Sequence, residues 1–157
     1  CDLTGEVPFI RKMIDQHHAA ATTARSRIVH CCGYDSVPSD LGCFVLQEKA
    51  LDQTGHPVQV VRYATGPTKG GVSGGTVASM VGIITAARAD RAMLGQLMDP
   101  YSLDPELSAS GGGVDGRDPM GVSWSALHQQ WTAPFLMAGI NTRVVRRSHA
   151  LFGRPWG

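Results

Sequence analysis

Apolar side chains recur every three or four residues in several stretches of the chain, and this spacing predicts amphipathic helices. The first helix is expected to begin near Pro8, because proline has no N–H group to leave unbonded in a first turn. The second is expected to begin after Ser36, a good N-cap residue, with Pro38 just inside it. Four helices are predicted, over residues 8–24, 37–53, 76–98 and 135–148.

Two apolar stretches between these helices have the composition and length of strands. Residues 27–32 are expected to form a short buried strand that Gly33 ends, and residues 58–64 alternate between apolar and polar side chains. Residues 99–121 carry three prolines and five glycines, so they are expected to form a loop. The order of helix, strand, helix, strand, helix, loop and helix is typical of an α/β fold.

The overall composition indicates a folded chain without strong long-range charge attraction. Hydrophobic residues make up 43% of the 157 residues, charged residues make up 17%, and the net charge is +1. A nucleic-acid partner is therefore not expected. The apolar run around residues 134–140 is far too short to span a bilayer. The cysteines at positions 1, 31, 32 and 43 lack the paired spacing of a metal site, so we expect reduced thiols in a cytoplasmic protein and no bound metal.

A cluster of polar residues follows the first predicted strand. Asp35, Ser36, Ser39 and Asp40 crowd the start of the second helix. They could line a ligand site, because α/β sheets bind ligands beyond the carboxyl ends of their strands. They could also cap the helix, although capping accounts for Ser36 and one aspartate more easily than for all four. Both interpretations remain open.

A glycine-rich segment precedes the third predicted helix. Residues 66–75 contain five glycines, but they do not match the dinucleotide fingerprint GxGxxG, because Ser73 stands where a glycine is required. The segment could hold an anion through its N–H groups, with Lys69 adding a positive charge. It could equally be a tight turn that needs positive φ.

Other reactive side chains lack the partners that catalysis or metal binding would need. Ser73 has no base at a recognisable spacing, so a hydrolase is not expected. His17 and His18 lack an i, i+4 partner for a metal, and His30 is expected to be a hydrogen-bonded core histidine. The basic residues of the last helix are expected to offset the dipole at its end, and contact with a phosphate is the alternative: Arg143, Arg146 and Arg147.

Four longer segments are residues 2–6 (DLTGE), 32–42 (CGYDSVPSDLG), 69–76 (KGGVSGGT) and 134–148 (PFLMAGINTRVVRRS). Together they resemble the saccharopine dehydrogenase-like oxidoreductases, and more closely the mycobacterial trans-acting enoyl reductases and their animal relatives. The resemblance implies hydride transfer from NADPH or NADH to a lipid-linked enoyl group in phthiocerol-type lipid biosynthesis. It leaves open an association with a membrane surface.

The same resemblance implies a domain organisation. The family has an N-terminal Rossmann domain whose glycine-rich phosphate loop would lie before Cys1. Residues 1–54 would be the C-terminal portion of that Rossmann-type domain, and residues 55–157 would be a partial α/β substrate domain. The chain is then expected to be a fragment of a larger enzyme, inactive by itself, with weak cofactor affinity and apolar faces that promote aggregation.

The resemblance also implies where ligands would bind. The nicotinamide cofactor, NADP or NAD, would lie near six residues: Asp2, Thr4, Gly5, Glu6, Asp35 and Ser36. The substrate would lie beside the second glycine-rich loop: Lys69, Gly70, Gly71, Ser73, Gly74, Gly75 and Thr76. No residue is assigned as the catalytic acid. Two other interpretations remain open, a non-catalytic binding or scaffold protein with this fold and an inactive product of a truncated gene.

Overall fold

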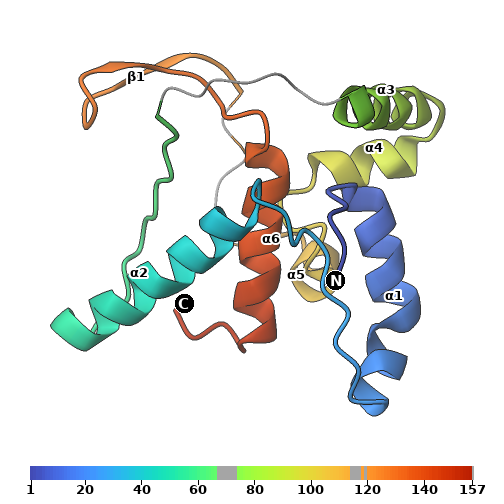
Figure 1. The fold of residues 1–157 in the computed structure, drawn as a ribbon, viewed down its shortest axis with the longest axis horizontal. Coiled ribbons are helices and arrows are strands. Elements are labelled where there is room, and N and C mark those ends of the chain that lie inside the picture. Colours follow the sequence, from blue (N-terminus) through green and yellow to red (C-terminus); the bar gives the residue numbers. More distant parts are fainter. Residues whose placement is uncertain (67–73, 114–117, 119, 157) are drawn as a thin grey trace.

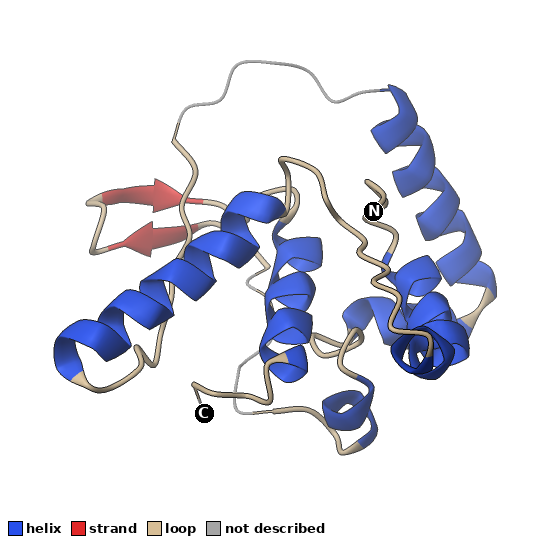
Figure 2. Ribbon diagram, turned by 60° about the horizontal axis from the view of Figure 1, so that its bottom comes forward, coloured by secondary structure: helices blue, strands red, loops and turns tan. Residues whose placement is uncertain are grey.

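The computed structural model describes residues 1–66, 74–113, 118 and 120–156. Helices dominate it, and the strands in the described residues form one small antiparallel hairpin (Figures 1 and 2). The elements in chain order are α1 (Val7–Thr23), α2 (Val37–Thr54), α3 (Gly74–Ala89), α4 (Arg91–Met98), α5 (Pro105–Ala109), β1 (Ser123–Ser125), β2 (Gln130–Thr132) and α6 (Ala138–Leu151). This helix-dominated mixture is consistent with an α/β fold, but it does not show a Rossmann-type parallel sheet.

The first two helices begin and end close to the predicted positions. Pro8 lies in the first turn of α1, and Pro38 lies in the first turn of α2. α2 ends at Gly55, whose φ of 72° is left-handed and lets its N–H group bond to the Leu51 carbonyl at 2.9 Å. Local chemistry therefore accounts for both ends of α2.

The single helix expected over residues 76–98 is wrong, because the structure has two helices there. α3 and α4 meet at Asp90, whose side chain accepts hydrogen bonds from the N–H groups of Ala92 and Met93 at 2.8 and 3.4 Å. Asp90 is thus the N-cap of α4, and a capping aspartate competes with continuation of the preceding helix. The turn at Asp90 allows α4 to pack against α3.

The loop expected over residues 99–121 is partly wrong, because it contains a short helix. Asp104 is the N-cap of α5 and accepts from the N–H group of Leu107 at 3.4 Å, while Pro105 lies in the first turn. The turn before it is buried, with Leu103 only 2% exposed. One of the prolines that predicted a loop therefore starts a helix.

The β1–β2 hairpin has no counterpart among the predicted elements. Trp124 pairs with Trp131 across the hairpin, and their ring centroids lie 5.8 Å apart in an edge-to-face arrangement. Such aromatic pairs stabilise neighbouring strands. Each strand has only three residues, which is too few for the alternation of side chains to be recognised.

The strands expected over residues 27–32 and 58–64 are not present among the described residues. An extended segment becomes a strand only when a neighbouring segment takes up its N–H and C=O groups. Residues 27–32 have such backbone bonds at two points, both with Asp2. The N–H group of Asp2 donates to the Val29 carbonyl at 3.0 Å, and its carbonyl accepts from the N–H group of Cys32 at 2.9 Å. Val58 is held instead by the side-chain amide of Gln47, through two hydrogen bonds of 2.9 Å. Neither segment finds enough backbone partners to form a strand.

A small apolar core lies around α6, which occupies the middle of the molecule with α1 and α2 on either side (Figure 1). The buried centre consists of Val7, Ile10, Cys31 and Leu103. Partly buried side chains packed around this centre are Ile14, Leu97, Ile140 and Val144. Since these residues come from both halves of the chain, α6 joins the halves through its packing.

Large apolar side chains remain exposed outside this core. Leu41 and Val45 on α2 are 57% and 60% exposed, and Val60 is 60% exposed. Apolar surface of this extent is typical of a face that contacts another molecule or segment. Aggregation of the isolated chain therefore stays a prediction. None of the described helices combines the length and the hydropathy that crossing a bilayer requires.

Candidate functional site

The two segments expected to face the cofactor lie next to each other. The thiol of Cys31 donates to the carbonyl of Thr4 at 3.0 Å, and Leu3 lies 3.6 Å from the position that a Cβ on Gly33 would occupy. We call residues 2–6 and 30–36 together the loop–turn junction. It contains all six residues expected near the cofactor, although whether they bind one stays a prediction.

Asp2 and His30 form a close pair within this junction. Oδ2 of Asp2 lies 2.6 Å from Nδ1 of His30, and Oδ1 of Asp2 accepts from the N–H group of Thr4 at 3.0 Å. Phe9 meets the His30 ring edge-to-face, with 6.0 Å between the centroids. The expectation of a hydrogen-bonded histidine is therefore confirmed for one ring nitrogen. The carboxylate that holds it was not anticipated, because Asp2 lies 28 residues away in the sequence.

Gly5 and Glu6 connect the junction to two other helices. A Cβ on Gly5 would lie only 3.1 Å from Cδ1 of Ile140 on α6, so close packing favours glycine here. The carboxylate of Glu6 accepts from the hydroxyl of Ser79 on α3 at 2.9 Å. The contact with Ser79 brings α3, the helix that follows the glycine-rich segment, against residues 2–6.

Cys31 has a strained backbone at the centre of the junction. Its φ of 58° is left-handed, a conformation that non-glycine residues rarely adopt. It is buried, and burial raises the pKa of its thiol to about 11. Strained residues of this kind cluster at functional sites, where the surrounding structure holds them.

The cluster of Asp35, Ser36, Ser39 and Asp40, which we call the polar turn, is held by Asn141, a residue that the sequence analysis did not select. Ser36 is the N-cap of α2, but its hydroxyl donates to Oδ1 of Asn141 at 2.9 Å and makes no side-chain cap. The Asn141 amide donates to the carbonyl of Asp35 at 2.7 Å and to the hydroxyl of Ser39 at 3.1 Å. The capping interpretation is therefore wrong for Ser36: its backbone is helical, with φ −112° and ψ −36°, and its hydroxyl is turned to donate to a buried asparagine from α6.

Asp40 also faces α6. Its carboxylate accepts from the hydroxyl of Ser148 at 2.9 Å. Burial raises the pKa of Asp40 above its ordinary value, and the hydrogen bond from Ser148 offsets part of that rise. Ser36, Ser39 and Asp40 thus join two helices.

Asp35 is the member of the turn whose side chain is exposed. It lies at a hollow of about 270 Å³ whose other walls include three aromatic residues: Tyr34, Tyr63 and Phe135. A carboxylate among aromatic rings offers a hydrogen-bond acceptor next to flat apolar faces. Of the six residues expected near the cofactor, Asp35 is therefore the best placed to meet a ligand.

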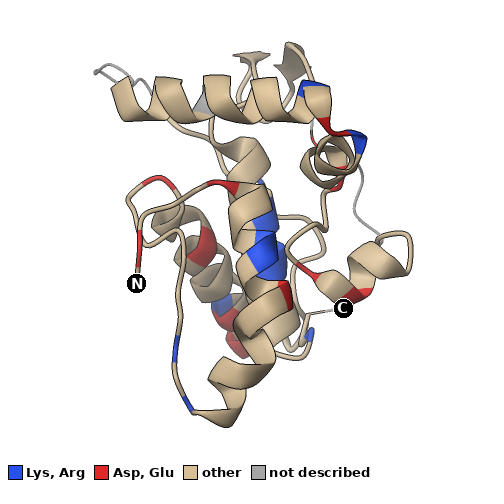
Figure 3. Ribbon diagram, turned by 90° about the vertical axis from the view of Figure 1, so that its right-hand side faces the viewer, with Lys and Arg blue, Asp and Glu red and all other residues tan. Residues whose placement is uncertain are grey.

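The basic residues of α6 do not act as expected. Because α6 continues to Leu151, they lie within the helix and not at its end (Figure 3). Arg143 is 3% exposed and donates to Asp118 at 2.7 Å and to the carbonyl of Leu97 at 2.8 Å. Arg146 donates to the carbonyl of Pro100 at 3.0 Å. These arginines therefore bind the chain around α4 and α5 to α6, where dipole compensation had been predicted.

The glycine-rich loop is only partly described. Lys69, Gly70, Gly71 and Ser73 lie outside the described residues. Gly74, Gly75 and Thr76 form the first turn of α3. The expectation that this loop lines the substrate side stays a prediction.

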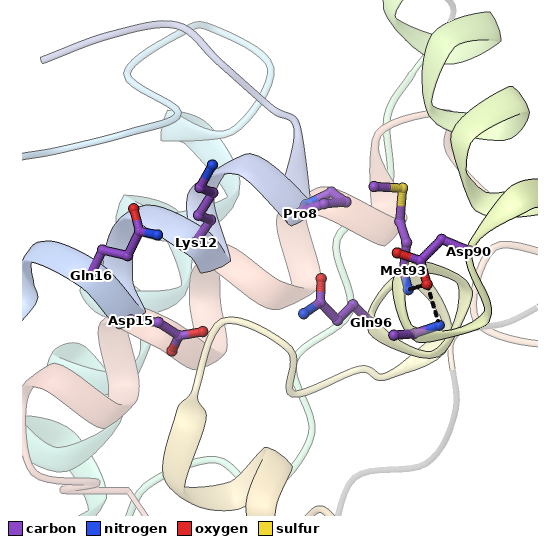
Figure 4. A pocket seen from close by; sticks show the side chains of 8 residues that line it. Pro8, Lys12, Asp15, Gln16, Asp90, Met93 and Gln96 are labelled. Carbon is purple, nitrogen blue, oxygen red and sulfur yellow. Dashed lines mark hydrogen bonds between the residues drawn. The ribbon is translucent and has the colours of Figure 1, made fainter.

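A second hollow, of about 350 Å³, lies between α1 and α4 (Figure 4). Lys12 and Asp15 come from α1, while Met93 and Gln96 come from α4. Asp90 at its edge is already engaged as the cap of α4. The hollow contains none of the predicted site residues, so we do not assign it a ligand.

The chemistry of the junction suits one end of a nicotinamide cofactor. Its polar side chains are mainly carboxylates and hydroxyls, and residues 1–10 and 28–48 contain no Lys or Arg. Carboxylates accept hydrogen bonds from ribose hydroxyls and carboxamides, whereas a diphosphate needs N–H groups or cations. Asp35, the exposed carboxylate of the junction, could accept hydrogen bonds from a nicotinamide or its ribose, but the junction offers a diphosphate no charged partner. Within the described residues, no group of three or more His, Cys, Asp or Glu side chains could hold a metal ion.

Comparison with known proteins relates the chain to mycobacterial reductases. A Mycobacterium tuberculosis protein, provisionally named a trans-acting enoyl reductase, is 41% identical over 160 residues, which cover 99% of this chain and 38% of that protein. The trans-acting enoyl reductases of Mycobacterium leprae and Mycobacterium bovis are 36% identical, over 99% and 96% of this chain and 38% and 37% of their own lengths. The chain thus spans less than two fifths of the relatives it matches.

No family model matches this chain, and no solved structure matches it. The relatives support the enoyl reductase type of the resemblance. They do not show membership of the wider saccharopine dehydrogenase-like family.

Proposed function

We propose that this chain is a section of an NAD(P)-dependent enoyl reductase that acts on lipid-linked enoyl groups in phthiocerol-type lipid biosynthesis. The similarity to trans-acting enoyl reductases over nearly the whole chain supports an enoyl reductase role. The observation that carries the proposal furthest is the loop–turn junction, which contains the six residues expected near the cofactor, among them the exposed Asp35.

The proposed division of labour follows the two parts of the chain. Residues 1–54 would contribute the cofactor side as the tail of a dinucleotide-binding domain, and residues 55–157 would contribute the substrate side. The hydrogen bond between Ser36 and Asn141 supports a fixed geometry between these parts, because it joins α2 to α6. Fixed geometry is what hydride transfer needs from a protein.

At the cofactor side, Asp35 would accept hydrogen bonds from the carboxamide or the ribose of the nicotinamide. Tyr34, Tyr63 and Phe135 would offer ring faces against which the planar nicotinamide can pack. When bound, the cofactor would supply the hydride, while the protein supplies alignment and the exclusion of water.

At the substrate side, α3 presents apolar side chains on its surface. Val77, Val81 and Ile84 are 50%, 58% and 53% exposed. The same helix reaches the junction through the bond between Ser79 and Glu6. An acyl chain lying along α3 would therefore approach the cofactor side of the site.

A reduction assay on the intact protein tests the proposal. We expect NADPH or NADH to be oxidised only when a trans-2-enoyl thioester is present, with turnover rising as the acyl chain lengthens. Asp35→Asn should raise the KM for the cofactor by about tenfold, since a hydrogen bond to a charged group contributes about 1.5–3 kcal/mol. Asp52→Asn, an exposed change on α2, is the matched control.

Two outcomes would contradict the proposal. Cofactor oxidation that does not depend on the enoyl group would remove the assigned reaction. Cofactor binding without turnover of any enoyl thioester would favour a non-catalytic scaffold with the same fold.

A further inference from the structure

We infer that Asp2 and His30 form a proton-donating dyad in which Nε2 of His30 supplies the proton that enoyl reduction requires. This inference rests on the proposed function and deepens it, because that function leaves the catalytic acid unassigned. The residues belong to the loop–turn junction, and their pairing is observed directly in the distance of 2.6 Å between Oδ2 and Nδ1.

The hydrogen bonds of Asp2 determine which ring nitrogen is available. An ionised carboxylate can only accept hydrogen bonds, so the Nδ1 atom facing it must carry a hydrogen. The other carboxylate oxygen is engaged by the N–H group of Thr4 at 3.0 Å, which fixes the orientation of the group. Nε2 is thereby left as the nitrogen that gains and loses a proton.

The ring of His30 is held in place, while Nε2 stays accessible. The side chain is 14% exposed and packs against the edge of Phe9. Nε2 has no hydrogen-bond partner among the described residues, and it is not among their buried unpaired nitrogen and oxygen atoms. An imidazole anchored at one nitrogen and open at the other is the arrangement that general acid catalysis uses.

The surrounding backbone supports a functional role. Asp2 bonds on both sides of His30, to Val29 and to Cys32, so the two side chains are aligned by the main chain as well. Cys31, the next residue after His30, has the left-handed φ of 58°. Such a conformation persists only where the surrounding structure holds it, and it is frequent at functional sites.

The proton balance of the step is simple. Enoyl reduction takes up a hydride at the β-carbon, and the electron pair of the carbon–carbon double bond moves to the α-carbon. The Nε2–H bond of protonated His30 then breaks and a C–H bond forms at the α-carbon. Neutral His30 retains Nδ1–H toward Asp2, and solvent returns a proton to Nε2. Both electrons of the reduction come from the reduced nicotinamide.

The first experiment determines the tautomer of His30 and does not depend on enzymatic activity. Long-range ¹⁵N–¹H NMR of the ¹⁵N-histidine-labelled protein distinguishes the two neutral tautomers of His30. We expect the Nδ1–H tautomer in the unmodified protein. In Asp2→Asn we expect the Nε2–H tautomer to gain population, because the asparagine amide can donate to Nδ1. An Nε2–H tautomer in the unmodified protein would overturn the dyad.

The second experiment measures turnover of enoyl thioesters by the intact protein. His30→Gln should lower kcat by about 10²- to 10⁴-fold, the usual contribution of a general acid, while the Kd for NADPH stays within about twofold. His17→Gln, an exposed change on α1, should leave kcat unchanged. Circular dichroism checks the fold, and if His30→Gln does not fold, Asp2→Asn replaces it with an expected loss of at least about tenfold in kcat.

The outcomes separate the two claims. Full turnover in His30→Gln overturns the dyad and leaves the proposed function intact. Absence of enoyl reduction by the unmodified protein overturns the proposed function and the dyad's role in it, whatever tautomer His30 adopts.

Discussion

The hydroxyl of Ser36 donates a 2.9 Å hydrogen bond to the side-chain oxygen of Asn141, which lies 105 residues further along the chain. Asn141 is 5% exposed, and its amide also holds the Asp35 carbonyl and the Ser39 hydroxyl. This one side chain therefore joins the start of α2 to α6 and orients the polar turn on which Asp35 stands.

Replacement of Asn141 by alanine should destabilise the fold. The buried hydroxyls of Ser36 and Ser39 and the carbonyl of Asp35 would lose a partner, and an unsatisfied buried group costs about 1–3 kcal/mol. We expect the free energy of unfolding to fall by about 2 kcal/mol in urea titrations. Gln53→Ala, on the exposed surface of α2, should change it by less than about 0.5 kcal/mol. Equal losses in the two variants would show that the Asn141 network contributes no stability.

Asp40→Asn should stabilise the protein at neutral pH. Burial raises the pKa of Asp40 in the folded state above the ordinary value of 3.8. The folded state therefore favours the protonated form of Asp40. The stability that this preference adds is fully present below pH 3.8 and is lost as the pH rises through the folded-state pKa. Asparagine carries no charge at any pH and can still accept from Ser148. We expect Tm at pH 7 to rise by about 2 °C.

The pH dependence distinguishes this explanation from a general effect of the substitution. The difference in Tm between Asp40→Asn and the unmodified protein should disappear in acid, where Asp40 is protonated. Asp52→Asn, also on α2 but exposed, is the control. If Asp40→Asn instead changed the turnover of the intact protein and left Tm unchanged, Asp40 would belong to a ligand site.

Cys31 should resist alkylation far more than Cys1. A thiol with a pKa of about 11 is ionised in about one molecule in a thousand at pH 8, and Cys31 is also buried, whereas Cys1 is exposed. Peptide mapping after a timed iodoacetamide reaction should find Cys1 modified first and Cys31 last. In denaturant the two cysteines should react at similar rates. Rapid labelling of Cys31 in the folded chain would show that the junction opens.

Two glycine-to-alanine substitutions should have opposite effects on stability. Gly5→Ala would place a Cβ 3.1 Å from Ile140, so it should destabilise the fold by about 1 kcal/mol through overpacking. Gly42→Ala lies within α2 with no atom within 4 Å of the new Cβ, so it should stabilise by about 0.5–1 kcal/mol through helix propensity. Urea midpoints of both variants test this, and a stabilising Gly5→Ala would contradict the close packing.

The 157-residue chain by itself should bind NADPH weakly or not at all. The glycine-rich segment before α3, residues 66–75, does not match the GxGxxG fingerprint, and no Lys or Arg within residues 1–10 or 28–48 can meet the diphosphate. Isothermal titration should show no saturation in the micromolar range. Micromolar affinity would contradict this expectation and would direct attention to the N–H groups of residues 66–75.

Short-range chemistry explains the part of the fold that the sequence predicts well. Pro38 at the start of α2 and the left-handed Gly55 at its end act within a few residues of themselves, so their effect is visible in the sequence. The break between α3 and α4 also has a local cause, because Asp90 caps α4. The apolar spacing continues past Asp90, however, and therefore predicted one uninterrupted helix. Asp104 before Pro105 at the start of α5 is a similar case.

Two segments that the resemblance selects lie next to each other, but the contacts that hold them were not predicted. Residues 2–6 and 32–36 could be selected by resemblance, and the structure brings them together through the contacts of Asp2 with Cys32 and of Leu3 with Gly33. The partners that hold them could not be selected, because Asn141, Ser79 and His30 are each remote in sequence from the side chains they meet.

The sequence by itself determined where helices form, because caps, prolines and apolar spacing act over one or two turns. Tertiary structure decided whether residues 27–32 became a strand, whether Ser36 capped its helix, and what the arginines of α6 bind. Each of these depends on which donor or acceptor arrives from a distant segment. A hydroxyl or a backbone group takes the partner with the best geometry, and that geometry exists only after the chain has folded.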